Sequence, residues 1–192
     1  MLRLLIMAIS LIFLAGLANA QNGIDHGPTG TLNLDYFNGA KDPHITWLVK
    51  DQDHYHTKPL IGAFGEGDLR RVKVELEWIL ARFINHPQAL FIAAAYSIRT
   101  KNPTWAVPHF QRALSIYPQY ALTHAQYGKY LTDIGAIDQG IEQLKKAAEM
   151  DPNLVAVHVW LAAAYAKSGN ADRAREAAEK ARSLGHKGEI PK

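Results

Sequence analysis

Apolar residues recur at intervals of three and four along most of the chain after residue 68, with polar residues between them. This spacing is typical of amphipathic helices, because it gathers the apolar side chains on one face. In residues 68–83 the apolar stripe consists of Leu69, Val72, Leu76, Ile79 and Phe83. The pattern predicts an all-α protein.

The helical pattern repeats when the sequence is shifted by 34 residues. The stretches HFQRALSIYP (109–118) and QLKKAAEMDP (143–152) carry a bulky residue, an Ala and a Pro at equivalent positions. The repetition predicts helix–turn–helix units at residues 87–120, 121–154 and 155–188. The aligned sets are Ala106, Phe110, Ala113 and Pro118, then Gly140, Leu144, Ala147 and Pro152, then Ala174, Ala178, Ala181 and His186.

Local signals place the ends of these helices. Thr104, Asp138 and Asp172 each precede a second helix, and their side-chain oxygens are expected to cap it. Gly135 and Gly169 follow a first helix, where a left-handed residue commonly ends the helix. The turn within each unit is therefore predicted to be short.

The repeated pattern resembles that of the tetratricopeptide repeat family, which has a 34-residue period and an Ala-x-x-x-Phe-x-x-Ala…Pro second helix. The first-helix pattern of that family is carried by Tyr127-Gly128…Leu131 and Leu161-Ala162…Tyr165. The resemblance implies an α-solenoid whose first helices line a concave groove. A looser resemblance of LDYFNGAKDP, VKDQDHYHT and INHPQAL to the leaders of small exported proteobacterial repeat proteins implies no activity.

The chain before the repeats is expected to contain one helix and an irregular segment. Residues 68–86 are predicted to be a lone second helix that covers the apolar side of the first unit. Residues 21–67 show no sustained period and are predicted to be an irregular leader, with one short ordered piece, helix or strand, at 45–50. The glycines of 61–67 favour a flexible turn over a phosphate-binding turn, because no strand precedes them. Residues 189–192 are a tail.

The first 20 residues have the pattern of a cleavable secretory signal. Arg3 precedes an unbroken apolar run at 4–17, and small residues allow cleavage after Ala20. The run is short for a bilayer span, although an uncleaved anchor remains the alternative. The mature chain is expected in the periplasm or secreted, with no membrane span after signal cleavage.

Composition narrows the possible functions. The chain has no cysteine, which excludes disulfides and thiolate metal sites. The formal charge of +3 comes from interspersed basic and acidic residues, so no nucleic acid partner is expected. No nucleophile with an identifiable base, metalloprotease motif or carboxylate pair is recognisable, so neither enzymatic activity nor a cofactor is predicted.

The segment KDQDHYHT at 50–57 suggests an alternative, metal-handling function. His54 and His56 would share a face if the segment were extended, and Asp51 and Asp53 could add oxygen ligands for zinc or copper. A solvated loop is the interpretation we favour, because no third histidine lies nearby in the sequence. His124 and His158 occupy equivalent repeat positions and are expected to pack between helices.

The resemblance to the repeat family implies a partner-binding groove that is mainly small and apolar. It lacks the Lys, Arg and Asn cluster that some relatives use to hold a terminal carboxylate. A helix or an extended segment of another envelope protein or peptide would suit it, but the chain's own leader, through Leu32, Leu34, Tyr36 and Phe37, could also occupy it. The implied groove residues are Gln88, Phe91, Ala95, Leu122, Ala125, Lys129, Asp133, Ala156, Val159, Ala163 and Lys167.

Overall fold

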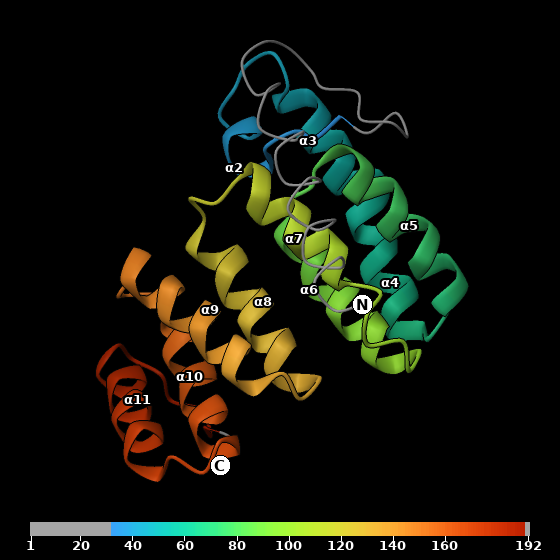
Figure 1. Cartoon of the computed structure of the whole chain (residues 1–192). Coiled ribbons are helices and arrows are strands. Elements are labelled where there is room, and N and C mark those ends of the chain that lie inside the picture. Colours follow the sequence, from blue (N-terminus) through green and yellow to red (C-terminus); the bar gives the residue numbers. More distant parts are fainter. Residues whose placement is uncertain (1–31, 191–192) are drawn as a thin grey trace, which may run out of the picture.

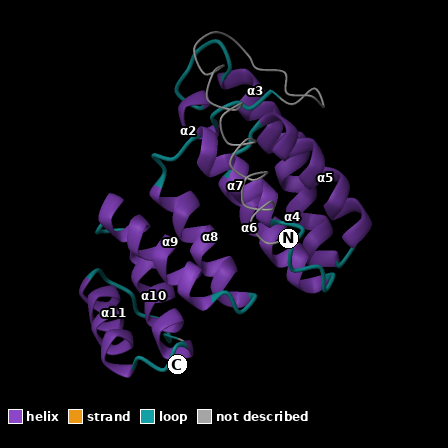
Figure 2. Cartoon of the chain, viewed as in Figure 1, coloured by secondary structure: helices purple, strands orange, loops and turns teal. Residues whose placement is uncertain are grey.

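A computed structural model describes residues 32–190 and is all-α over that range (Figure 1). Antiparallel helices follow one another in a curved row, and Figure 2 shows the short loops that join them. The helices are α2 (Tyr36–Gly39), α3 (Thr46–Gln52), the π-helix η1 (Asp53–Thr57), α4 (Lys58–Glu66), α5 (Leu69–Arg82), α6 (Pro87–Arg99), α7 (Val107–Ile116), α8 (Ala121–Asp133), α9 (Ile137–Met150), α10 (Val155–Lys167) and α11 (Ala171–Ser183). The predicted fold class is confirmed. The predicted signal segment lies outside the described residues.

The predicted repeats appear as helix pairs. Residues 87–120 contain α6 and α7, residues 121–154 contain α8 and α9, and residues 155–188 contain α10 and α11. His124 and His158 bind equivalent carbonyl oxygens, with Nε2–O distances of 2.9 Å to Pro118 and 2.8 Å to Pro152. The two histidines are equivalent, as the repetition predicted, but they bind the turn before each first helix, which the prediction of packing between helices did not include.

The expectation of an irregular leader up to residue 67 is wrong. α3, η1 and α4 follow one another without a break, and α4 packs against α5 as an antiparallel partner. Shifted by 34 residues, the start of η1 falls on Pro87, the start of α6. The helix α5 is therefore not alone, since a further helical hairpin precedes the predicted ones.

This first hairpin is difficult to predict from the sequence because α4 contains Pro59, Gly62 and Gly65, which are poor helix formers. Pro59 lies in the first turn, where its missing N–H is tolerated. Leu60 and Ala63 are buried in the core shared with α5, so tertiary packing outweighs the weak local propensity. Gly67 then ends α4 in the left-handed conformation, with φ +80°.

Capping only partly follows the prediction. Asp68 caps α5 and accepts a hydrogen bond from the Arg71 N–H, and Gly135 and Gly169 have positive φ as expected. The caps expected at Thr104, Asp138 and Asp172 are not found. The second helices begin after Ala106, Ala136 and Asn170 instead, and of these only Asn170 caps with its side chain.

The two aspartates still favour their helices. Asp138 lies in the first turn of α9 and Asp172 in the first turn of α11, where a negative charge interacts favourably with the helix dipole. The prediction named residues that do belong to the helix start, but it placed the caps of α9 and α11 too late in the sequence, inside the first turn.

The core falls into two clusters along the solenoid. In the first, Phe110 stacks on Tyr127 and Tyr130, at ring-centroid distances of 5.2 and 5.8 Å. The second is built from smaller side chains, among them Leu144, Ala147, Val157 and Leu161. Between them α8 and α9 approach closely: a Cβ added to Gly128 would lie 2.7 Å from the Gly140 carbonyl oxygen.

Residues 32–40, the N-terminal strap, cross the turns at one end of the helices. The Leu32 and Leu34 N–H groups donate to the carbonyls of Ala81 and Arg82, at 2.8 and 2.7 Å. Leu34 and Phe83 form an isolated β-bridge, the only strand-like pairing among residues 32–190. The strap is therefore fixed to the end of α5 by backbone hydrogen bonds.

Candidate functional site

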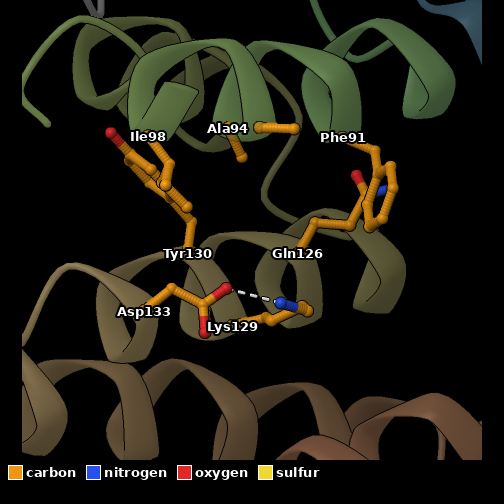
Figure 3. Close-up of a pocket in the computed structure, with 8 residues that line it drawn as sticks. Phe91, Ala94, Ile98, Gln126, Lys129, Tyr130 and Asp133 are labelled. Atoms are coloured by element: carbon orange, nitrogen blue, oxygen red, sulfur yellow. Dashed lines mark hydrogen bonds and ion pairs between the residues drawn. The ribbon is translucent and has the colours of Figure 1, made fainter. Parts of the chain in front are cut away.

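The candidate site is a depression between two neighbouring first helices, α6 and α8. Its volume is about 80 Å³. We call it the α6–α8 groove, and Figure 3 shows most of its side chains converging from the two helices. Its lining residues are Phe91, Ala94, Ala95, Ile98, Gln126, Lys129, Tyr130 and Asp133.

Large apolar side chains are exposed at the rim of this groove. Phe91 is 45% exposed and Ile98 is 47% exposed. They are seven residues apart on α6, two helical turns, and so they lie on the same face. An exposed apolar pair that flanks a depression is the surface pattern of an interaction site.

The groove also contains a buried polar group with an unsatisfied acceptor. Gln126 is only 7% exposed, and its Nε2 donates to the Pro87 carbonyl oxygen at 3.0 Å. Its Oε1 is buried and has no hydrogen-bond partner among the described residues. A buried oxygen without a donor carries a desolvation cost, which a ligand offering an N–H would relieve.

A row of charged side chains lies along the α8 side of the groove (Figure 3). Asp133 accepts from Lys129 Nζ at 2.5 Å and from Lys167 Nζ of α10 at 3.3 Å. All three side chains are at least one-quarter exposed, so the pairs contribute little to stability. Two cations against one anion leave the row with an excess positive charge.

The predicted groove residues are found at different depths. Phe91, Ala95, Lys129 and Asp133 line the depression, whereas Ala125 is fully buried in the second core cluster and cannot contact a partner. The remaining predicted positions are at least partly exposed on α6, α8 and α10; they are Gln88, Leu122, Ala156, Val159, Ala163 and Lys167. Whether they bind a partner stays a prediction.

The sequence reasoning missed four lining residues, Ala94, Ile98, Gln126 and Tyr130. Ile98 could have been found, because it repeats the position of Phe91 two turns later. Tyr130 could not, since its ring is packed in the core while its hydroxyl donates to the Pro103 carbonyl. Burial raises the pKa of the Tyr130 hydroxyl.

The two histidines of the metal hypothesis do not share a face. Their segment is the π-helix η1, neither extended nor a loop, and residues two apart in a helix point in different directions. His56 pairs with Glu75, at 2.8 Å between Nδ1 and Oε2, and stacks on Trp78, while His54 lies near Lys58. No group of three or more His, Asp or Glu side chains that could hold a metal occurs within residues 32–190. The geometric premise of the metal hypothesis is thus wrong.

The described part of the leader does not lie in the groove either. The Tyr117 hydroxyl donates to the Asn33 carbonyl at 2.6 Å, and the Tyr120 hydroxyl donates to Asp35 Oδ2 at 2.5 Å. Phe37 stacks on Tyr120 at 4.4 Å between ring centroids. These contacts place the strap on the turns beside α7 and α8, so self-occupancy by Leu32, Leu34, Tyr36 and Phe37 is not observed.

A polar cluster fixes the strap from its other side. Asp53 of η1 accepts from the Tyr36 hydroxyl at 3.1 Å and lies 3.3 Å from Nε2 of the buried His86. Burial, with a smaller effect of Asp53, raises the pKa of Tyr36 to about 12. Burial alone would raise the pKa of Asp53, but hydrogen bonds from His86, Tyr36 and Thr57 outweigh it and lower that pKa. The cluster therefore consists of an ionised carboxylate held by hydrogen-bond donors.

A second depression, of about 440 Å³, lies at the C-terminal end of the solenoid. Within residues 32–190 no helix follows α11, and Ile190 packs against the second core cluster. The depression is lined by small side chains, two arginines and that isoleucine: Ala162, Ala166, Gly169, Ala171, Ala174, Arg175, Ala178, Arg182 and Ile190.

These features define a class: an all-α solenoid of helical hairpins whose first helices expose a groove. Residues 131–188 match the family model described as tetratricopeptide repeat. Residues 131–188 therefore carry tetratricopeptide repeats. No curated protein sequence matches it.

Solved structures share the fold. MamA from Desulfovibrio magneticus RS-1, in a fragment from residue 41, is 22% identical over 74% of this chain and 75% of its own, with a TM-score of 0.53. A second MamA crystal structure is 19% identical over 78% of this chain and 84% of its own, with a TM-score of 0.53. YrrB, described as a TPR protein with an unusual peptide-binding site, is 18% identical over 90% of this chain and 92% of its own, also with a TM-score of 0.53.

Proposed function

We propose that the protein is a scaffold that binds a segment of a partner protein in the α6–α8 groove and performs no catalysis. The observation that carries the proposal is the exposed pair Phe91 and Ile98 on either side of the depression. Burying their exposed apolar surface against a partner would be favourable, at about 25 cal/mol per Å².

The scaffold around the groove supports the same function. α6 and α8 are each held by their neighbours in the first core cluster, so the groove is formed before a partner arrives. A preformed surface lowers the ordering cost of binding on the protein side. YrrB, which has the same fold, is named for a peptide-binding site.

The partner is proposed to be an envelope protein or peptide, because residues 1–20 have the pattern of an export signal. Within residues 32–190 the structure contains no helix long and apolar enough to span a bilayer. Mass measurement of the N-terminus of the protein isolated from its host tests the location. A chain that begins at Gln21 supports export, and a chain that retains residues 1–20 argues against it.

Site-specific photocrosslinking in living cells tests the groove. A photoreactive phenylalanine analogue at Ile98 is expected to capture a defined partner, and Ala95→Glu in the same chain is expected to abolish the adduct by placing a charge in the depression. The matched control carries the analogue at Val74, which is 60% exposed on α5 outside the groove. Equal capture at both positions, or capture unaffected by Ala95→Glu, would contradict the proposal.

A further inference from the structure

We propose that the groove takes an extended peptide segment, one of whose backbone N–H groups donates to Gln126 Oε1 beside Phe91. This inference rests on the proposed function and adds the conformation and chemistry of the ligand. It begins from the unsatisfied Gln126 oxygen, which no other described residue reaches.

The orientation of the Gln126 amide is set by its other end. Nε2 donates to the Pro87 carbonyl oxygen at 3.0 Å. If the amide were turned over, two oxygens would face each other at that distance, which is unfavourable. The bond to Pro87 therefore fixes which end of the amide is the oxygen. Turning the amide over would not give Oε1 a hydrogen-bond partner.

Phe91 lies beside the Gln126 side chain, and both residues line the groove (Figure 3). Figure 3 shows the Phe91 side chain from α6 and the Gln126 side chain from α8 meeting in the groove. Because the Phe91 ring is 45% exposed, its outer side is not packed against other described residues. A rotation of this ring about its side-chain torsions gives a ligand access to Oε1, and the ring can then pack against the ligand.

The need of Gln126 Oε1 for a hydrogen-bond donor favours one ligand conformation over another. In the interior of an α-helix every backbone N–H already donates within the helix, and only the first turn has free N–H groups. An extended segment offers free N–H groups along its whole length. A helix lying in the groove would leave Oε1 unsatisfied, so the geometry favours an extended ligand.

The charged row adds a second requirement. Lys129 and Lys167 share the single carboxylate of Asp133, so a ligand carrying an acidic side chain near its apolar anchor is favoured over a basic one. The ligand is thus an extended segment with an apolar side chain at Phe91 and Ile98 and an acidic residue directed at the lysines.

The test uses the mature chain and peptides selected on it from a random peptide library. Each backbone N–H of the best peptide is replaced in turn by N-methyl, and affinities are measured by calorimetry. One replacement is expected to weaken binding to the wild-type protein about five- to tenfold, as expected for one lost hydrogen bond. The unmodified peptide is expected to bind the Gln126→Met variant more weakly than the wild-type protein, by a similar factor. The N-methyl replacement should then cause no further loss of affinity for this variant.

The control is Gln139→Met, the same change at an exposed position on α9. This variant should bind the unmodified peptide and the N-methyl peptide with the same affinities as the wild-type protein does. The N-methyl series on the wild-type chain stands without any variant, so a folding defect in Gln126→Met does not remove the test.

The outcomes separate the two proposals. If selected peptides bind equally well to Ala95→Glu, or if no peptide is selected, the proposed function of the groove is wrong. If peptides bind in the groove but gain helical circular dichroism, or if no N-methyl position is coupled to Gln126, the groove function stands and the extended, N–H-donating ligand is overturned.

Discussion

At the scale of single residues, the contact between α8 and α9 depends on two glycines. A Cβ on Gly128 would lie 2.7 Å from the Gly140 oxygen and 2.9 Å from the Leu144 nitrogen, which are backbone atoms that cannot move alone. Around Gly62 of α4, by contrast, the space that a Cβ would enter is open, with no neighbouring atom within 4 Å. The same residue type therefore has opposite structural roles at the two sites.

Gly128→Ala is expected to destabilise the protein by about 1–3 kcal/mol, because the two helices must separate to admit the methyl group. Gly62→Ala is the matched control and is expected to stabilise by about 0.5–1 kcal/mol, since alanine is the better helix former at an open position. Urea unfolding followed by circular dichroism measures both changes. Similar effects at the two positions would show that the close approach is absent.

At the scale of elements, the N-terminal strap joins parts that are distant in the sequence. It bonds to the end of α5 through its backbone and to the turn before α8 through Asp35 and Tyr120. Burial, together with the hydrogen bond to Asp35, raises the pKa of Tyr120 to about 12, so its hydroxyl remains a donor to the carboxylate at neutral pH. This bond is charge-assisted and hence stronger than a neutral one.

Tyr120→Phe is expected to lower the free energy of unfolding by about 1–2 kcal/mol through loss of that donor. Limited proteolysis should then cut within the strap faster than in the wild-type protein. Tyr165→Phe is the control, because the Tyr165 hydroxyl has no hydrogen-bond partner within residues 32–190, and a change below about 0.5 kcal/mol is expected. A strap equally protected in both variants would contradict the role given to Tyr120.

The elements also show what the sequence could predict. The helices from α6 to α11 were predictable, because Phe110, Leu144 and their equivalents recur every 34 residues on one face. The η1–α4 helix was not, since Gly62 and Gly65 lie on its exposed side and obscure the period. Ala125 was assigned to the groove although tight packing of α8 buries it, and the free oxygen of Gln126 depends on distances that no sequence pattern encodes.

At the scale of the whole molecule, the C-terminal end of the second core differs from its middle. Ala147, inside the solenoid, is fully buried, whereas Ala178, on the second helix of the last repeat, lines the open C-terminal depression. In a repeat protein each unit is stabilised by its neighbours, so a terminal unit has room that an internal unit lacks.

Ala147→Leu is therefore expected to destabilise the protein by about 1–3 kcal/mol through overpacking. Ala178→Leu should be neutral or stabilise by up to about 1 kcal/mol, since the added carbons fill existing space. Thermal unfolding of the two variants at equal concentration makes the comparison. A marked loss of stability in Ala178→Leu would mean that the depression is occupied in solution.

The strap also limits how far the row of helices can bend. It connects the turn after α5 with the turn before α8, and these two turns would move apart if the superhelix changed its curvature at that point. From α8 onward no such crosslink is found among the described residues, and only the Lys167–Asp133 pair links the exposed faces of α8 and α10. The strap therefore resists bending of the first hairpins, and the last two have no equivalent crosslink among the described residues.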